Sequence, residues 1–147
     1  MNIREARRAA GLTQSQLACA ARVSQPNLSA YENGRRTPSL EVLERIGRAL
    51  AGRPSVRVAA HRESIRDLVA KFHASDPRVF GSVARGDDEP GSDVDIVVDF
   101  TADASLLDEV GLRLALRDLL QVEVDVVASD GLRGAFRERV LSEAVPV

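Results

Sequence analysis

The chain has 147 residues and a formal net charge of −2, so it is long enough for one ordinary domain or two very small ones. It contains no apolar run near the roughly 20 residues that a membrane span needs, and its N-terminus lacks the apolar segment of a signal peptide. With a single cysteine, and therefore no internal disulfide, the composition predicts a cytoplasmic protein that does not contact a membrane.

The first third of the chain places apolar residues at helical spacing between residues that begin or end helices. Thr13 with Gln16 has the pattern of a capping box, and Ser24 is a second N-cap. Helices are predicted over residues 3–10, 14–21, 25–32 and 40–50. These segments indicate an all-α N-terminal helix-turn-helix bundle over residues 1–53, and the Gly-Arg-Pro-Ser stretch at 52–55 indicates a linker.

The rest of the chain alternates between helix-like and strand-like segments. Helices are predicted over residues 58–74, 106–120 and 132–144. Strands are predicted over residues 78–80, 94–100 and 122–128. This alternation predicts an α/β domain with a small mixed sheet over residues 58–147.

Charge divides along the same boundary. Residues 1–53 contain nine arginines and four acidic residues, whereas residues 54–147 contain eighteen acidic and eleven basic residues. A basic half favours a polyanion as its partner, while an acidic half could hold metal ions or could simply aid solubility. The chain is therefore expected to hold two modules with different partners.

The basic half carries a specific motif, the run LTQSQLACAARVSQPNLSAYENGRRTPSLEVLERIGRAL. Two short helices joined by a turn are the outline of a helix-turn-helix. At its spacing the run resembles the Cro and phage-repressor (XRE-like) type of this motif, across residues 1–51. The resemblance implies a homodimer that binds double-stranded operator DNA with its third helix in the major groove. The alternative is a helical scaffold that binds protein.

Eight side chains are candidates for the DNA contacts that this resemblance implies. Those expected to face base edges from the third helix are Gln25, Pro26, Asn27 and Ala30. Glutamine and asparagine can pair with adenine, whereas proline and alanine offer only apolar contact. Those expected to face phosphates, in contacts that make binding depend on salt, are Gln14, Ser29, Arg35 and Arg36.

Two carboxylates interrupt the apolar strand near residue 94. Alternate strand residues share a face, so Asp93 and Asp95 point together, about 7 Å apart at Cα, while Val94 points into a core. Their carboxylates can converge on one divalent ion, or on two ions about 4 Å apart. Oxygen-only ligands select Mg²⁺ or Mn²⁺. If the next strand is adjacent, Asp125 can join them; the plainer alternative is an ordinary acidic sheet face.

A Gly81-Ser82 pair follows the short strand at 78–80 and precedes a helix-compatible stretch. Glycine lets the backbone approach a phosphate closely, and the amides that follow can point at the anion. Ser82 can donate its hydroxyl hydrogen, and Arg85 can neutralise phosphate charge. The turn is therefore a candidate phosphate site.

The order Gly-Ser, ten residues, Asp-x-Asp and a later strand-borne Asp resembles the nucleotidyltransferase fold of the DNA polymerase β superfamily, over roughly residues 60–130. It is most similar to the minimal nucleotidyltransferases of the MntA antitoxin type. The resemblance implies metal-assisted attack on the α-phosphorus of ATP or another nucleoside triphosphate. It implies that Mg²⁺ or Mn²⁺ is the cofactor.

The same resemblance implies a role for each candidate residue. Asp93 and Asp95 would hold both ions. Asp125 would complete the ion that activates the acceptor hydroxyl and could take its proton. The residues that would hold the β- and γ-phosphates are Gly81, Ser82 and Arg85.

Joined to a DNA-binding module, the resemblance implies an antitoxin or autoregulator that transfers AMP from ATP to a HEPN-type toxin or another cognate protein. Two alternatives stay open. One is a transcriptional repressor whose second domain is non-catalytic and serves for nucleotide sensing or dimerisation. The other is a nucleotidyltransferase toxin that acts on tRNA.

Overall fold

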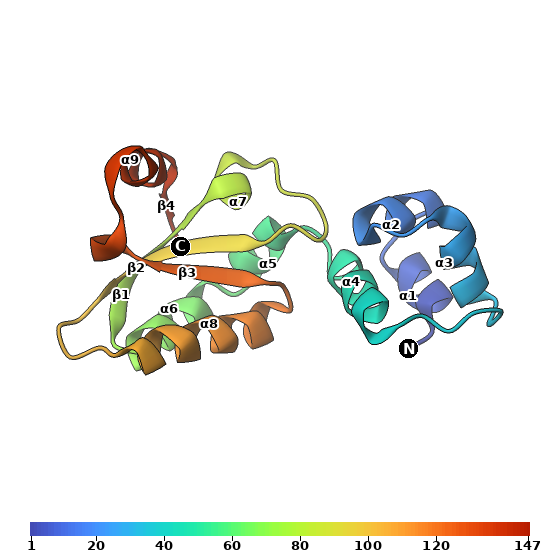
Figure 1. The fold of residues 1–147 in the computed structure, drawn as a ribbon, viewed down its shortest axis with the longest axis horizontal. Coiled ribbons are helices and arrows are strands. Elements are labelled where there is room, and N and C mark those ends of the chain that lie inside the picture. Colours follow the sequence, from blue (N-terminus) through green and yellow to red (C-terminus); the bar gives the residue numbers. More distant parts are fainter. The chain divides into compact units, whose positions relative to one another are not determined.

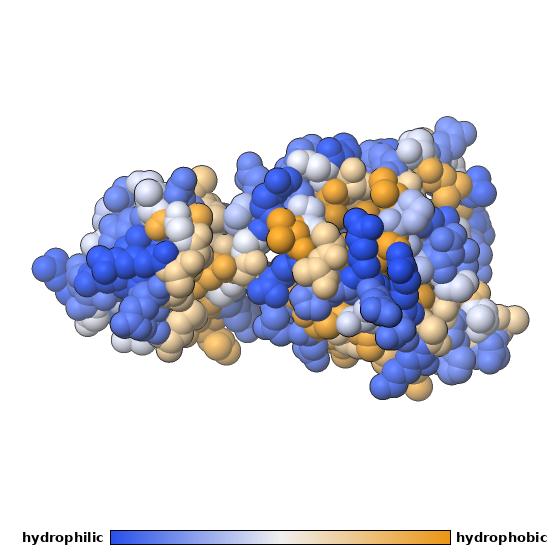
Figure 2. Space-filling view, turned by 180° about the vertical axis from the view of Figure 1, so that it is seen from behind, coloured by the Kyte–Doolittle hydropathy of each residue, from blue (hydrophilic) through white to orange (hydrophobic).

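The computed structural model describes residues 1–147, which separate into two compact units (Figure 1). The first unit contains Met1–Arg53 with the loop residues Glu89–Gly91, and the second contains Pro54–Asp88 and Ser92–Val147. None of the helices has the length and hydrophobicity needed to cross a membrane. On the face drawn in Figure 2, hydrophobic residues are interspersed with hydrophilic ones.

Four helices make the first unit. They are α1 (Ile3–Ala9), α2 (Gln14–Ala21), α3 (Gln25–Glu32) and α4 (Leu40–Leu50). The predicted caps are confirmed, because Thr13 and Gln16 form a capping box and Ser24 accepts a hydrogen bond from the Asn27 amide. The predicted all-α bundle is therefore confirmed, with α2, α3 and α4 at their predicted bounds.

The helices of this unit enclose one apolar core. Its fully buried side chains include Leu17, Leu28 and Ile46. Cys19 of α2, the single cysteine of the chain, is exposed. It follows the buried Ala18, and one further residue turns a side chain by about 100° around a helix, away from the core.

The second unit is built on a mixed sheet with helices around it. Its helices are α5 (Pro54–Ala60), α6 (Arg62–Lys71), α7 (Gly81–Arg85), α8 (Leu106–Leu120), the 3-10 turn η1 (Ser129–Gly131) and α9 (Gly134–Glu143). Its strands are β1 (Ala74–Phe80), β2 (Val94–Phe100), β3 (Val124–Ala128) and β4 (Val145–Pro146). The strand order is β3-β2-β1-β4. β2 runs parallel to β3 and antiparallel to β1, so the predicted small mixed sheet is confirmed.

Both faces of this sheet are packed (Figure 1). On one face, Val94, Ile96 and Val98 of β2 pack with α6 and α8, as the alternation in the sequence predicts. On the other face, a smaller cluster lies under α9; its buried members are Phe80, Val97, Leu132 and Val140. The face that carries the strand carboxylates is therefore partly covered by α9.

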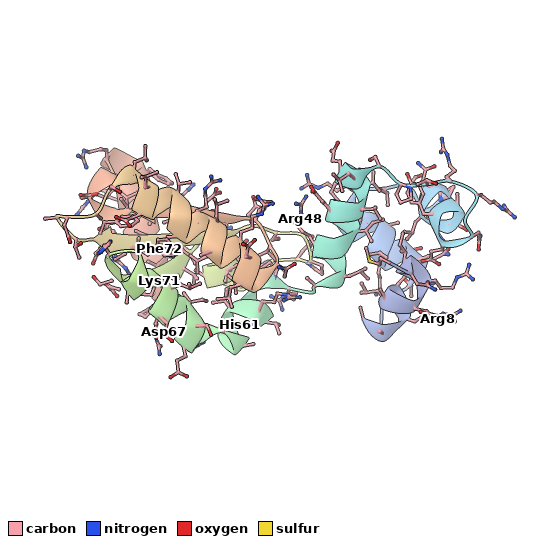
Figure 3. The ribbon with its side chains drawn as sticks, turned by 90° about the horizontal axis from the view of Figure 1, so that it is seen from below. Arg8, Arg48, His61, Asp67, Lys71 and Phe72 are labelled. Carbon is pink, nitrogen blue, oxygen red and sulfur yellow. The ribbon has the colours of Figure 1, made fainter.

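The two helices on the first face lie side by side (Figure 3). They approach closely at Gly111 of α8, where a Cβ atom would lie 2.6 Å from Cε1 of Phe72. Only a residue without a side chain fits against the Phe72 ring at this distance. Gly111 therefore sets how closely α8 can approach the end of α6.

Two predicted boundaries on the N-terminal side of the second unit are wrong. The segment 52–55 is not a linker throughout, because α5 begins at Pro54, in a first helical turn where a missing N–H costs little. The carboxylate of the buried Asp88 accepts a hydrogen bond from the Ser55 amide at 2.8 Å and stabilises that turn. The helix predicted over 58–74 is two helices separated at His61.

Two strand predictions also need correction. β1 begins at Ala74 rather than at residue 78, because a register shift between Ser75 and Arg78 breaks the alternation that marks a strand. β4 was not predicted at all. It has only two residues, one of them Pro146, and it exists only because β1 offers it an edge.

Candidate functional site

The strand carboxylates come together at one edge of the sheet. Asp95 of β2 and Asp125 of β3 are partners in the parallel ladder, which places their Cα atoms about 4.8 Å apart. Asp93 lies directly before β2 begins at Val94. β2 and β3 are therefore adjacent, as the inclusion of Asp125 in the site requires.

The negative charges of these carboxylates interact electrostatically. Burial, and next the neighbouring charges of Asp125 and Asp93, raise the pKa of Asp95 to about 6, against a smaller opposite effect of Arg139 and Arg85. A carboxylate in such surroundings is stabilised by a nearby positive charge. The side chains as placed do not yet form a ligand set, because no group of three or more His, Cys, Asp or Glu residues is positioned to hold a metal ion.

The residues fit a hard divalent cation in their chemistry. All three donors are carboxylates, and two of them occupy opposed positions on adjacent strands. Burial first, and then the negative charges of Asp125 and Asp93, raise the pKa of Asp95, and a cation at this place would stabilise its charged form. The strands that carry Asp95 and Asp125 are already paired, so these two donors start from neighbouring backbone positions.

The Gly81-Ser82 turn lies against the same carboxylates. Gly81 has a φ of +69°, and a Cβ atom there would lie 2.5 Å from Oδ2 of Asp95. The positive φ and the close approach both require glycine. The turn leads directly into α7, which carries Arg85, so the candidate phosphate residues and Asp95 lie in one place.

Two donors of this turn already have an anionic partner that the sequence did not reveal. Glu143, the last residue of α9, accepts a hydrogen bond from the Gly81 amide at 3.2 Å through Oε2. Arg85 donates from Nη1 to Oε1 of Glu143 at 3.3 Å and from Nε to Asp87 at 3.3 Å. Helix α9 was predicted, but nothing local indicates that it packs across the carboxylate face.

In the first unit, the predicted base-reading residues lie at the start of α3. Gln25 and Pro26 are exposed, while Asn27 and Ala30 are half-buried. The side chains of Gln25 and Asn27 have partners within the unit: Ser15 donates to Gln25 at 3.1 Å, and Arg36 donates to Asn27 at 2.8 Å. Hydrogen bonding to a base would replace these contacts.

The predicted phosphate-facing residues fall into two groups. Arg35 and Arg36 are exposed after α3, and the half-buried Ser29 accepts a hydrogen bond from Asn33 at 3.4 Å. Gln14 is instead tied to the fold, because its amide donates to the buried Glu32 at 3.0 Å. This hydrogen bond joins α2 to α3 and leaves the Gln14 amide less available to a phosphate.

The comparisons with known proteins match the two parts of the chain to different families. Residues 61–147 match the family described as nucleotidyltransferase domain, and residues 3–56 match the family described as helix-turn-helix. The protein adenylyltransferase MntA of Thermococcus cleftensis is 38% identical over 90 residues, which are 61% of this chain and 88% of that protein.

Solved structures give the same result for the second unit. A minimal nucleotidyltransferase is similar with a TM-score of 0.58 and 45% sequence identity, over 63% of this chain and 95% of that one. A toxin-antitoxin structure with AMP-PNP is similar with a TM-score of 0.51 and 21% identity, over 57% of this chain and 69% of that one. At that identity the second likeness concerns the fold alone.

Proposed function

The chain belongs to the nucleotidyltransferase domain family, and from this premise we propose that it transfers AMP from ATP to a hydroxyl group of a partner protein, while its helix-turn-helix unit binds operator DNA. The observation that carries the proposal is the meeting of Asp95 and Asp125 on paired strands beside the Gly81 turn. The carboxylates would hold a divalent cation that neutralises and positions the triphosphate, and the turn would bind its phosphates.

Each residue has a distinct task in this proposal. Asp93 and Asp95 would hold Mg²⁺ or Mn²⁺, with Asp125 as a third ligand, and the bound ion would supply charge neutralisation at the reacting phosphate. Gly81 would donate its amide N–H, and Ser82 its hydroxyl, to the β- and γ-phosphates. Arg85 would add a guanidinium to the same phosphates.

The chemical step is a substitution at the α-phosphorus. The acceptor oxygen forms a bond to the α-phosphorus, and the bond from that phosphorus to the oxygen bridging to the β-phosphate breaks. Pyrophosphate leaves with the bonding electrons. The proton of the acceptor hydroxyl passes to Asp125, which lies on the exposed side of the paired strands.

The test uses the full chain, Mg²⁺, ATP labelled at the α-phosphate and the product of the adjacent gene as acceptor. Label is expected to pass to the acceptor and to be lost in Asp93→Asn and Asp95→Asn. Asp99→Asn is the matched control, because Asp99 lies on the same strand but pairs with Arg78 at 2.7 Å, away from the proposed site. Absence of transfer to any acceptor, with the chain folded, would reject the catalytic proposal.

Each of the two units implies a partner of its own. We propose that the acceptor is a HEPN-type toxin or another cognate protein, and that the chain binds a palindromic operator as a homodimer. The match of residues 3–56 to the helix-turn-helix family and the nine arginines of residues 1–53 support the DNA partner. Light scattering with and without the operator duplex tests this, and a monomer on a single half-site would contradict it.

One observation favours a second candidate, a repressor whose second unit does not catalyse. Glu143 occupies the Gly81 amide and Arg85, the groups that would otherwise bind phosphate. A chain that binds DNA and takes up nucleotide but never transfers label would support this candidate. The labelling assay therefore separates the two.

A further inference from the structure

The phosphate turn carries a carboxylate from a distant part of the chain. Both oxygens of Glu143 are used: Oε2 accepts the Gly81 amide N–H at 3.2 Å, and Oε1 accepts from Nη1 of Arg85 at 3.3 Å. An amide N–H and a guanidinium held by one carboxylate form the same kind of donor set that binds a phosphate group. The carboxylate of Glu143 is thus an anion that these two donors already bind.

The helix that carries Glu143 is fixed in place on both sides of it. Val140 of α9, about one turn before Glu143, is fully buried in the cluster with Phe80 and Val97, and β4 follows with Val145 paired to Val79 of β1. The side chain of Glu143 is itself partly exposed, at 20%. Its carboxylate can therefore swing toward solvent by side-chain rotation alone, without a shift of the helix or the sheet.

The same face of α9 turns other groups toward the site. Phe136, Arg139 and Glu143 are spaced three and four residues apart, so they form one stripe of the helix. The ring of Phe136 meets Phe80, the residue before Gly81, edge to face at 6.4 Å. The guanidinium of Arg139 lies 5.3 Å from the centre of the Phe136 ring. α9 therefore lines this site as well as packing on the sheet.

We propose that Glu143 sets the affinity of the nucleotide site: in the nucleotide-free chain its carboxylate takes the place of a substrate phosphate group at the Gly81 amide and Arg85, and it withdraws when a triphosphate binds. This inference rests on the proposed function, because it assumes that these two donors bind phosphate. It adds that every binding event first breaks two charge-assisted hydrogen bonds and brings a polyphosphate close to a carboxylate.

The test measures the affinity of the full chain for α,β-methylene ATP with Mg²⁺ by titration calorimetry. This analogue cannot release pyrophosphate from its α-phosphorus, so binding is measured without transfer. Glu143→Gln removes the charge and keeps the shape, and is expected to bind the analogue about tenfold more tightly. Glu143→Asp, whose shorter side chain reaches the turn less well, is expected to bind more tightly to a smaller degree.

Two controls make the result specific. Glu138→Gln removes an exposed acid from the same helix and is expected to leave the affinity unchanged. AMP has no β- or γ-phosphate, so its affinity is expected to change little in Glu143→Gln. Thermal unfolding of each variant, followed by circular dichroism, reports whether the substitution has disturbed α9.

The outcomes separate this inference from the proposed function. If the wild-type chain binds the analogue and Glu143→Gln binds it equally or more weakly, Glu143 only positions Arg85 or assists the cation, and the inference is wrong while the proposed function stands. If neither the wild-type chain nor any variant binds the analogue, the proposed function fails at this site and the inference fails with it.

Discussion

Gly81 and Asp95 lie so close that a methyl group on the glycine would be 2.5 Å from Oδ2 of the aspartate. The two residues are on different elements, one in the turn that begins α7 and the other on β2. Their contact joins the proposed phosphate turn to the proposed cation ligand, so a change in either displaces the other. The β1-β2 pairing places Phe80, the residue before Gly81, opposite Asp95 and so brings the turn beside this carboxylate.

The first prediction concerns that contact. Gly81→Ala is expected to displace the Asp95 carboxylate and to reduce label transfer by about 100-fold, because misplacement of a reacting group by about 1 Å has an effect of that size. Gly86→Ala is the matched control: its φ of +79° imposes similar backbone strain, but a Cβ atom there meets nothing within 4 Å. Equal losses of transfer in the two variants would show that strain alone, and not the contact, matters.

The second prediction is that Asp95 reduces stability. Its pKa is raised from 3.8 to about 6, so the penalty for its charge is absent below pH 3.8, grows as the pH rises toward 6 and is complete above that. Asp95→Asn is therefore expected to raise the free energy of unfolding by about 1–2 kcal/mol at pH 8, and by little at pH 4, while label transfer is lost. Denaturant titrations at the two pH values, without divalent cations, measure this.

The stability of the same variants is also expected to differ in the presence of Mg²⁺. Mg²⁺ should stabilise the wild-type chain more than Asp95→Asn, because the ion offsets the carboxylate repulsion that the variant lacks. Asp99→Asn should respond to Mg²⁺ like the wild-type chain. Equal stability of Asp95→Asn and the wild-type chain at pH 8 would contradict the proposed cost of this charge.

Local pattern was enough to place the elements that carry the proposed chemistry. The alternation around Val94, Ile96 and Val98 identifies β2 and its buried face, and the capping box at Thr13 identifies the start of α2. Both signals come from residues only a few positions apart, where the geometry of the backbone fixes which side chains share a face. The functional resemblance depends on the same short motifs.

Long-range packing accounts for what the sequence did not indicate. Val97 has the alternation of an outward residue, yet it is fully buried because α9 folds back across that face. Glu143 reaches Gly81 across 62 positions of sequence. No periodicity or capping signal encodes a contact over such a distance, because it depends on how the whole sheet and its connections pack.

The third prediction concerns the buried carboxylate of the first unit. Glu32 accepts hydrogen bonds from Nε and Nη2 of Arg7 at 2.6 and 3.1 Å, with a further bond from Gln14. These bonds, the one from Arg7 first, lower the pKa of Glu32 from 4.5 to about 2. Its contribution to stability is therefore complete above pH 4.5 and is lost as the pH falls through 2.

Glu32→Gln is accordingly expected to lower the free energy of unfolding of this unit by about 2–3 kcal/mol at pH 7, and by much less at pH 2. Tyr31 is the only tyrosine and the chain has no tryptophan, so tyrosine fluorescence during denaturation reports on this unit alone. Glu44→Gln, an exposed acid of α4, serves as the control. A difference between Glu32→Gln and the wild-type chain that does not depend on pH would contradict the assignment.

The fourth prediction concerns the contact between α6 and α8. Gly111→Ala places a Cβ atom 2.6 Å from the Phe72 ring, so it is expected to destabilise the second unit by about 1–3 kcal/mol, although alanine favours helices. Gly47→Ala in α4 meets nothing within 4 Å and is expected to stabilise its own unit by up to about 1 kcal/mol. The two substitutions are therefore expected to change the free energy of unfolding in opposite directions, which chemical denaturation measures. A gain in stability from Gly111→Ala would contradict the close packing of α8 against Phe72.

The fifth prediction concerns DNA. Arg36 donates to Asn27 at 2.8 Å in the free chain, and we expect each to exchange this bond for DNA, Arg36 for a phosphate and Asn27 for a base edge. Arg36→Ala should then weaken binding to every duplex and reduce the slope of log affinity against log salt by about 1. Asn27→Ala should instead cost about 1–3 kcal/mol on the operator and little on an unrelated duplex.

Fluorescence anisotropy of labelled duplexes at several salt concentrations separates these two effects. Arg8→Ala is the control, because Arg8 is an exposed arginine of α1 (Figure 3) that is not among the predicted contacts. Loss of the Arg36 bond frees the Asn27 side chain, so the double variant tests whether the two residues act together. If Arg36→Ala leaves the salt dependence as steep as in the wild-type chain, Arg36 serves only to orient Asn27, and its phosphate contact must be abandoned.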